Sequence, residues 1–458
     1  MDQVRRKVRN VPVKPHCEKV VKFSEQHIGQ SGRVTKDLLS YFIAFAAAAA
    51  ICICLLVGSA LIPREAIRDN MLSTAETVSE EELFIYMNEG LNSSMLDRYA
   101  DSILLNIAYH YDSSDPLRSV MTSAYYFRPG ESENQSLLIS VQNDLPAERE
   151  YIRYWHGSAV PVRVMHLFTD LNGMIWADAA VIAVLTLFLL LVLIKNRLYA
   201  GAVAVAAGLA AAGVWYVPFC LEYTWVFMIM PASAAIAVLM TLKGDTERLG
   251  VLFIITGVVT NFFDFLTTET LTLLIPLMLV IYTARKRGGL RHEAFGALKL
   301  CVLWGTGYAG MWALKWGIAS AVLGENVMKY VTGHISERIG GLIDLPLGEY
   351  ILTALWRNIV CLFPVCLGSV GIVACVLIAF AAVYVCFVYR RKGIRPRDLA
   401  IYLALGAVPF IRLAVLHNHA FLHNMFTYRA LAATVAAVVL VTAEIIDRRK
   451  DNGRRRKA

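Results

Sequence analysis

The stretch LLSYFIAFAAAAAICICLLVGSALI, residues 38–62, decides the fold class of this chain. It contains no charged residue, and an α-helix needs about 20 predominantly apolar residues to cross a bilayer. It starts too far from the N-terminus, and is too long, for a cleaved secretion signal. The whole chain is 57% hydrophobic and 17% charged, with a mean hydropathy of +0.53. Such a composition excludes a soluble protein of this length.

Further apolar segments follow, and together they predict an all-α polytopic membrane protein with about ten transmembrane helices. The expected spans are 38–62, 174–194, 198–216, 222–242, 249–266, 268–284, 297–320, 365–389, 399–416 and 429–446. The chain is expected to begin with a basic N-terminal tail (1–37), which is followed by the first span (38–62) and a large loop (63–173). A membrane domain of about nine helices (174–446) comes next and includes an outer loop at 324–350. A basic tail (447–458) ends the chain.

Charge in the loops sets the expected orientation. Loop 63–173 has 17 Asp and Glu, 8 Arg and no Lys, whereas Lys and Arg gather in both tails and in the short loops of the other side. Basic loops face the cytoplasm. We therefore expect a multi-pass protein of the cytoplasmic (plasma) membrane with both termini cytoplasmic and loop 63–173 extracytoplasmic. The net charge of +8 then belongs to the lipid-facing cytoplasmic side, and no nucleic-acid partner is expected.

The large loop is expected to be mainly helical. Residues 79–82 have the capping-box pattern of a helix start. A second helix is predicted from Asp97, with apolar residues at helical spacing through Ala108. The Gly-, Ser- and Asn-rich stretch 127–143 predicts a loop or a short hairpin. None of the nine cysteines lies in the loop, so it must be held by packing on the membrane domain.

The motif LDRYAD, residues 96–101, places Asp97 and Asp101 one helical turn apart. In one interpretation an aspartate is a general base for an acceptor hydroxyl, or both hold a divalent cation. In the other, Asp97 is a helix N-cap and Asp101 a carboxylate favoured by the helix dipole. Spacing alone leaves both interpretations open.

The motif YIRYWHG, residues 151–157, gathers aromatic and basic residues in the same loop. They are Arg153, Tyr154, Trp155 and His156, with Arg163 seven residues further on. Aromatic residues beside Arg and His often only anchor a protein at the membrane interface. The same set is typical of a wall on which a sugar stacks, with a clamp for phosphate.

Polar residues also mark the outer ends of two spans. Asn261 and Asp264, in NFFDF, lie where a carboxylate needs a partner, so Asp264 is either part of a site or paired with Lys315 or Arg412. Lys315 either extends to the membrane surface or contacts a lipid-linked phosphate.

The short connection HNHAFLHNMFTY, residues 417–428, carries His417, His419 and His423 and precedes Arg429. Three close histidines raise the possibility of zinc, but no Glu is adjacent. Hydrogen bonding to a pyrophosphate or sugar and a structural role at the interface are the alternatives. No cofactor is certain, although a divalent cation is possible and the metal requirement is unknown.

The topology and these motifs resemble the GT-C type glycosyltransferases, which take sugars from polyprenyl-phosphate donors outside the cytoplasmic membrane. The segments LDRYAD, RYWHG, NFFDF and HNHAFLH…FTYR also resemble a group of bacterial membrane proteins of this type. The resemblance implies a GT-C-like fold with a catalytic Asp in the first outer loop, here Asp97 or Asp101. It also implies cations that hold the donor phosphate: Lys315, Arg338 or Arg429, joined by the histidines.

The sequence therefore predicts a glycosyltransferase that moves a sugar from a polyprenyl-phosphate-linked donor, held beside membrane lipid, to a cell-envelope glycan or protein acceptor. Arg153, Tyr154, Trp155, His156, Arg163, Asn261 and Asp264 are expected to bind the acceptor or sugar. The alternatives are a transporter or flippase of lipid-linked sugars and a membrane-bound acyltransferase. A transporter should show internal repeats and charges near mid-membrane, and an acyltransferase a deep His. The sequence shows no repeat, and its histidines lie at the rim.

Overall fold

Long helices dominate the computed structural model, which describes residues 15–245, 247–288, 293–339, 345–391, 393–394 and 396–446. Within these residues the only strands are β1 (Phe84–Tyr86) and β2 (Met95–Asp97), an antiparallel pair in which Phe84 faces Asp97. The protein is therefore all-α, as predicted. Residues 1–14 and 447–458 of the two basic tails lie outside the described residues, whereas residues 15–37 belong to the helix α1 (Pro15–Ala60).

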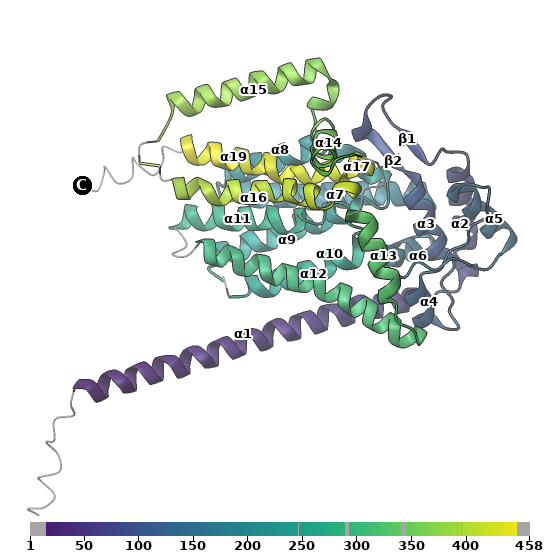
Figure 1. Ribbon diagram of the computed structural model, residues 1–458, viewed down its shortest axis with the longest axis horizontal. Coiled ribbons are helices and arrows are strands. Elements are labelled where there is room, and N and C mark those ends of the chain that lie inside the picture. Colours follow the sequence, from purple (N-terminus) through teal and green to yellow (C-terminus); the bar gives the residue numbers. More distant parts are fainter. Residues whose placement is uncertain are drawn as a thin grey trace, which may run out of the picture.

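A bundle of roughly parallel helices forms the body of the protein, with α15 set apart on one side (Figure 1). Its helices are α1 (Pro15–Ala60), α7 (Leu171–Lys195), α8 (Tyr199–Ala211), α9 (Thr224–Lys243), α10 (Leu249–Phe263), α11 (Leu271–Arg287), α12 (Glu293–Leu323), α15 (Ser369–Val388), α16 (Pro396–Val415) and α19 (Ala432–Ile446).

Six stretches of the described chain are long and apolar enough to cross a membrane. They are Lys36–Ala60, Leu171–Lys195, Thr224–Lys243, Ser369–Val388, Pro396–Val415 and Asn424–Ile446. The other four expected spans fall on α8, α10, α11 and α12, of which α8 and α10 are shorter apolar helices. One cause of the shortening is visible at Gly213, which ends α8 in a left-handed conformation (φ +61°) and leads into the 3₁₀ turn η2 (Val214–Phe219). Membrane character is supported, and the count of ten spans stays a prediction.

Loop 63–173 folds into a helical cap over one end of the bundle, where α13, α14 and α17 also lie (Figure 1). The cap contains α2 (Arg64–Ser79), α3 (Arg98–Tyr109), α4 (Pro116–Thr122), α5 (Glu133–Asn143) and α6 (Ala159–Met165). The other elements at this end are α13 (Met328–Ile339), α14 (Leu347–Ile359), α17 (His417–Leu422), α18 (Asn424–Thr427) and η4 (Tyr428–Leu431), together with the short 3₁₀ turns η1 (Asn92–Ser94) and η3 (Val365–Leu367).

Two local predictions within the cap are wrong. Ser79 ends α2 instead of starting a helix, and residues 84–86 form β1 because they pair with residues 95–97. The stretch 127–143 contains the helix α5 instead of a hairpin. The Ser132 hydroxyl caps this helix by accepting a hydrogen bond from the Gln135 N–H at 3.2 Å.

The cap is packed on the bundle through a continuous apolar core. This core joins Ile107 of α3 and Val141 of α5 to Leu56 of α1 and Met311 of α12, all of them completely buried. Burial of apolar surface stabilises by roughly 25 cal/mol per Å². The cap is therefore held by packing on the bundle, as the sequence predicted.

Candidate functional site

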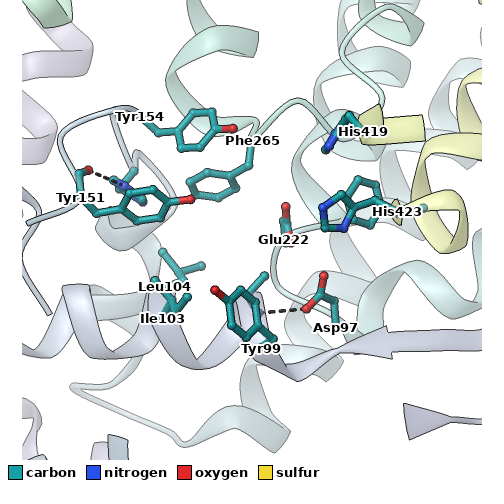
Figure 2. A pocket seen from close by; sticks show the side chains of 13 residues that line it. Asp97, Tyr99, Ile103, Leu104, Tyr151, Tyr154, Glu222, Phe265, His419 and His423 are labelled. Atoms are coloured by element: carbon teal, nitrogen blue, oxygen red, sulfur yellow. Dashed lines mark hydrogen bonds between the residues drawn. The ribbon is translucent and has the colours of Figure 1, made fainter. Parts of the chain in front are cut away.

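A pocket with an empty volume of about 560 Å³ lies where the cap meets the bundle (Figure 2). Five cap and bundle segments that are far apart in the sequence contribute to it. Its lining residues are Asp97, Tyr99, Ala100, Ile103 and Leu104 of the α3 region, Tyr151, Tyr154 and His156, then Glu222 and Phe265, and finally His419, His423 and Phe426. Five residues singled out in the sequence therefore share one pocket: Asp97, Tyr154, His156, His419 and His423.

Asp97 is both a helix cap and a pocket residue. Its Oδ1 accepts a hydrogen bond from the Ala100 N–H at 2.9 Å, which makes it the N-cap of α3. It is 2% exposed, and burial raises its pKa to about 7, with a further contribution from the nearby Asp101 carboxylate. The two interpretations drawn from the sequence are therefore compatible, because a capping carboxylate with this pKa can also exchange a proton near neutral pH.

Asp101 lies beneath the pocket and does not line it. Its Oδ2 accepts from Arg98 Nη1 at 2.9 Å, and its Oδ1 accepts from the Cys220 thiol at 3.4 Å and from the Glu222 N–H at 3.3 Å. Burial raises the pKa of Asp101, and the ion pair with Arg98 opposes that rise. These contacts tie the start of α3 to the turn before α9, so Asp101 holds two walls of the pocket together.

Glu222 is a pocket residue that sequence reasoning missed. It lies just before α9 and is 8% exposed. Figure 2 shows its carboxylate on the same side of the pocket as Asp97, His419 and His423. The available signal was a carboxylate at the outer end of the span expected at 222–242, the same kind of signal that drew attention to Asp264.

The opposite side of the pocket is an aromatic wall made of Tyr151, Tyr154, His156 and Phe265. The ring centroids of Tyr154 and Phe265 are 5.4 Å apart at 85°, and those of His156 and Phe265 are 5.2 Å apart at 45°. Arg153 supports this wall from outside the lining, because its guanidinium lies 4.6 Å from the Tyr154 ring and donates to the Tyr151 hydroxyl at 2.6 Å. This edge-to-face packing fixes the rings in place.

The histidine connection contributes two of its three histidines. His419 Nε2 lies 3.0 Å from the Leu266 carbonyl oxygen, and its ring centroid is 4.8 Å from that of His423. Both rings line the pocket. His417 instead packs edge-on against Tyr350 at 5.0 Å and is buried outside the pocket lining.

The expected donor-binding cations are used for packing instead of lining the pocket. Lys315 is completely buried and donates to the carbonyl oxygens of Val120 and Met121, at 2.9 and 3.1 Å, so it satisfies the end of α4. Arg429 is 1% exposed and donates to the Ala212 carbonyl at 3.2 Å, among other carbonyls. The expected single cavity of Lys315 with the histidines is therefore wrong. Arg338 belongs to α13, and its side chain lies outside the described part.

Three further expected ligand-binding residues are also structural or unassigned. Arg163 is completely buried and donates to carbonyl oxygens at the ends of α1 and α3. Trp155 is completely buried, and its Nε1 donates to the Met311 carbonyl at 2.9 Å. Asn261 is 2% exposed, outside the pocket lining, and both of its amide atoms lack a hydrogen-bond partner.

Asp264 does not pair directly with Lys315 or Arg412. Its carboxylate accepts from the Thr267 N–H and hydroxyl, while Arg412 makes a two-pronged contact with Glu269 at 2.7 and 2.8 Å. Arg412 also donates to the Leu266 carbonyl, the same acceptor that His419 contacts. This buried ion pair therefore supports the segment that carries Phe265 into the pocket, and His419 of α17 contacts the same segment.

The pocket contains groups that can move protons but no ready-made metal centre. No group of three His, Cys, Asp or Glu residues within the searched, described residues is arranged to hold a metal ion. Comparison of the chain with protein-family models, curated proteins and solved structures finds no match to any of them. The function must therefore be argued from the pocket itself.

Proposed function

We propose that the protein is an integral membrane glycosyltransferase of GT-C type, which transfers a sugar from a polyprenyl-phosphate donor to an extracytoplasmic acceptor. The observation that carries this proposal is the pocket between cap and bundle, with Asp97 and Glu222 on one side and an aromatic wall on the other. Carboxylates that face aromatic rings suit a reaction on a sugar, because the rings stack on its apolar faces and a carboxylate takes a proton from a hydroxyl.

The position of the pocket supports the same proposal. It lies at the end of the bundle covered by loop 63–173, which has no Lys and is expected to be extracytoplasmic. We infer that α8, α10, α11 and α12 cross the membrane together with the six stretches named above, giving ten crossings. Successive helices of the bundle run in alternating directions, and α19 ends far from the cap (Figure 1). The pocket would then open at the outer leaflet, where a lipid-linked donor resides.

In the proposed reaction Asp97 accepts the proton of the acceptor hydroxyl. The oxygen's electron pair forms a bond to the anomeric carbon of the donor sugar, and the bond from that carbon to the phosphate oxygen breaks. The phosphate leaves with that electron pair and stays on the lipid. His423, on the Asp97 side of the pocket, is the donor proposed for its growing charge, whereas Nε2 of the neighbouring His419 donates to the Leu266 carbonyl.

The experiment compares the full-length protein with Asp97→Asn and Asp115→Asn in proteoliposomes. A radiolabelled, short-chain polyprenyl-phosphate hexose is supplied with cell-envelope material as acceptor, and label leaving the lipid phase is counted. Asp115 is the matched control. It also caps the N-terminus of a helix, α4, within loop 63–173, but it lies outside the pocket. We expect Asp97→Asn to lower the rate about 10²–10⁴-fold and Asp115→Asn to leave it unchanged.

Two results would contradict the proposal. One is a wild-type protein that releases no more label than empty liposomes with any member of a panel of polyprenyl-phosphate hexoses. The other is an Asp97→Asn variant that transfers the sugar as fast as the wild type.

A further inference from the structure

Two buried polar atoms of the aromatic wall have no hydrogen-bond partner. They are Nδ1 of His156 and the hydroxyl oxygen of Tyr154. Both residues line the pocket, and each is 2% exposed. Buried polar atoms in folded proteins almost always have a partner. Atoms without one that belong to pocket-lining residues therefore indicate where a ligand supplies the missing hydrogen bonds.

The contacts of His156 determine which kind of partner Nδ1 needs. Its Nε2 lies 3.2 Å from the Tyr151 carbonyl oxygen, and because a carbonyl oxygen only accepts, Nε2 carries the hydrogen. Burial lowers the pKa of His156 well below its ordinary value, and the positive charges of Lys315 and Arg153 lower it further. The ring is therefore neutral, and Nδ1 presents a lone pair that accepts a hydrogen bond.

The backbone of His156 is held in an uncommon conformation. Its φ of +54° lies in the left-handed region, which residues other than Gly rarely adopt. Such strain persists only where the surrounding structure enforces it, and it is concentrated at functional sites. The strained backbone and the unpartnered Nδ1 are separate observations on the same residue.

We propose that the aromatic wall binds an uncharged sugar ring, with one ring hydroxyl donating to His156 Nδ1 and a second hydroxyl bonded to the Tyr154 hydroxyl. The two side chains are neighbours, since their ring centroids lie 6.0 Å apart at 88°. Adjacent hydroxyls of a hexose can therefore reach both of them. This inference rests on the proposed function and deepens it by naming the chemical class of the ring.

Acidic sugars fit this wall poorly. A carboxylate has no hydrogen to donate at neutral pH, so it would face the lone pair of Nδ1 with its own lone pairs. A sugar that lacks the donating hydroxyl would also bind poorly, because it leaves the buried Nδ1 without a partner.

The test measures binding without any lipid donor, so that it is independent of transfer. Full-length protein in nanodiscs is titrated with a panel of neutral methyl hexosides and with methyl glucuronide, and Kd is obtained by saturation-transfer NMR. At least one neutral hexoside should bind more tightly than methyl glucuronide. Tyr154→Phe should raise its Kd about threefold to tenfold, the usual worth of one neutral hydrogen bond.

Two further variants complete the design. His156→Asn tolerates the left-handed backbone but withdraws the imidazole nitrogen, so it should also raise Kd. Tyr111→Phe is the control, because it removes a buried tyrosine hydroxyl of the cap that lies outside the pocket. It should leave Kd unchanged. Thermal unfolding of each variant shows whether it is folded.

Three outcomes would overturn the inference: tighter binding of methyl glucuronide, no binding by any neutral hexoside, or a folded Tyr154→Phe variant that binds like the wild type. None of them decides the transfer reaction. Transfer without hexoside binding would contradict this inference and leave the proposed function intact. Hexoside binding without transfer would contradict the proposed function and leave this inference intact.

Discussion

At the scale of single residues, Asp97 combines two demands that oppose each other. Its position at the start of α3 favours the ionised carboxylate, because the helix dipole and the Ala100 N–H stabilise negative charge. Burial favours the neutral acid and outweighs this effect, so that the pKa rises to about 7. The balance gives a carboxylate that loses and regains a proton near neutral pH, which an exposed capping aspartate does not do.

This balance predicts a pH dependence with a definite sign. The proposed reaction requires ionised Asp97, so the wild-type rate of transfer should rise with pH through about 7 and level off above it. The folded state binds this proton more tightly than the unfolded chain does. The contribution of Asp97 to the free energy of unfolding is therefore greatest at low pH and falls as the pH rises to about 7. Rates measured between pH 5 and 9 in proteoliposomes give the first quantity, and thermal unfolding at the same pH values gives the second.

The Asn and Ala variants of Asp97 separate capping from catalysis. Asp97→Asn keeps a good cap and loses the titration, so its thermal stability should no longer fall as the pH rises. Asp97→Ala loses the cap as well and should be less stable than Asp97→Asn by about 1 kcal/mol. Equal stability of the two variants would contradict the capping role of Asp97. Asp115→Asn, which changes the N-cap residue of α4, is the control, and its pH–rate profile should match that of the wild type.

At the scale of elements, local patterns identified helices well where local contacts decide them. The apolar spans and the start of α3 at Asp97 follow from residues adjacent in the sequence. The strand at residues 84–86 does not, because its partner strand starts eleven residues further on, at Met95, and this pairing overrides the capping pattern at 79–82. The place of Glu222 beside Asp97 depends in the same way on tertiary contacts, such as those of Asp101 and Arg98, which hold the turn before α9 against α3.

Arg163 shows how a buried cation can join elements. Sequence reasoning placed it among sugar-binding residues, but it donates to the carbonyls of Ser59 and Ile62 at the end of α1 and to that of Ala108 in α3. The last carbonyls of a helix have no partner within the helix and carry partial negative charge. A guanidinium between two such ends satisfies both at once, which also explains why Arg163 lies away from the pocket.

Replacing Arg163 by Met should therefore destabilise the protein rather than weaken ligand binding. The change leaves several buried carbonyls without a donor, and we expect a loss of about 3 kcal/mol or more in the free energy of unfolding. Arg118→Met, at an exposed site of α4, should change stability by less than about 0.5 kcal/mol. Thermal unfolding in detergent measures both. If folded Arg163→Met kept wild-type stability and lost hexoside affinity, the structural assignment would be wrong.

At the scale of the whole molecule, the pocket exists only because the cap and the bundle form one core. Asp97 and three of the four wall residues (Tyr151, Tyr154 and His156) come from the cap. Glu222, the wall residue Phe265 and the two histidines come from segments between the bundle helices. Sequence reasoning placed these segments on one membrane face from the distribution of charge. It could not distinguish the residues that line the pocket from other polar residues at this face. Lys315 and Arg429 lie on the same face and differ from the pocket residues only in their tertiary partners.

The orientation of the whole molecule is the prediction on which the proposed donor depends, because lipid-linked sugars and acceptor glycans meet only outside the cytoplasm in the proposed reaction.

The experiment replaces the nine native cysteines and then introduces single cysteines at two exposed positions. One is Glu131, which is exposed on the cap, and the other is Arg248, whose side chain is 79% exposed between α9 and α10. An impermeant maleimide added to intact cells should label position 131, and it should label position 248 only after the membrane is permeabilised. The reason is the absence of Lys from the loop and its abundance in the loops opposite. Labelling of position 248 in intact cells, with position 131 protected, would show the opposite orientation and contradict the proposed donor at the outer leaflet. Equal labelling of both positions would show that they do not lie on opposite sides of the membrane.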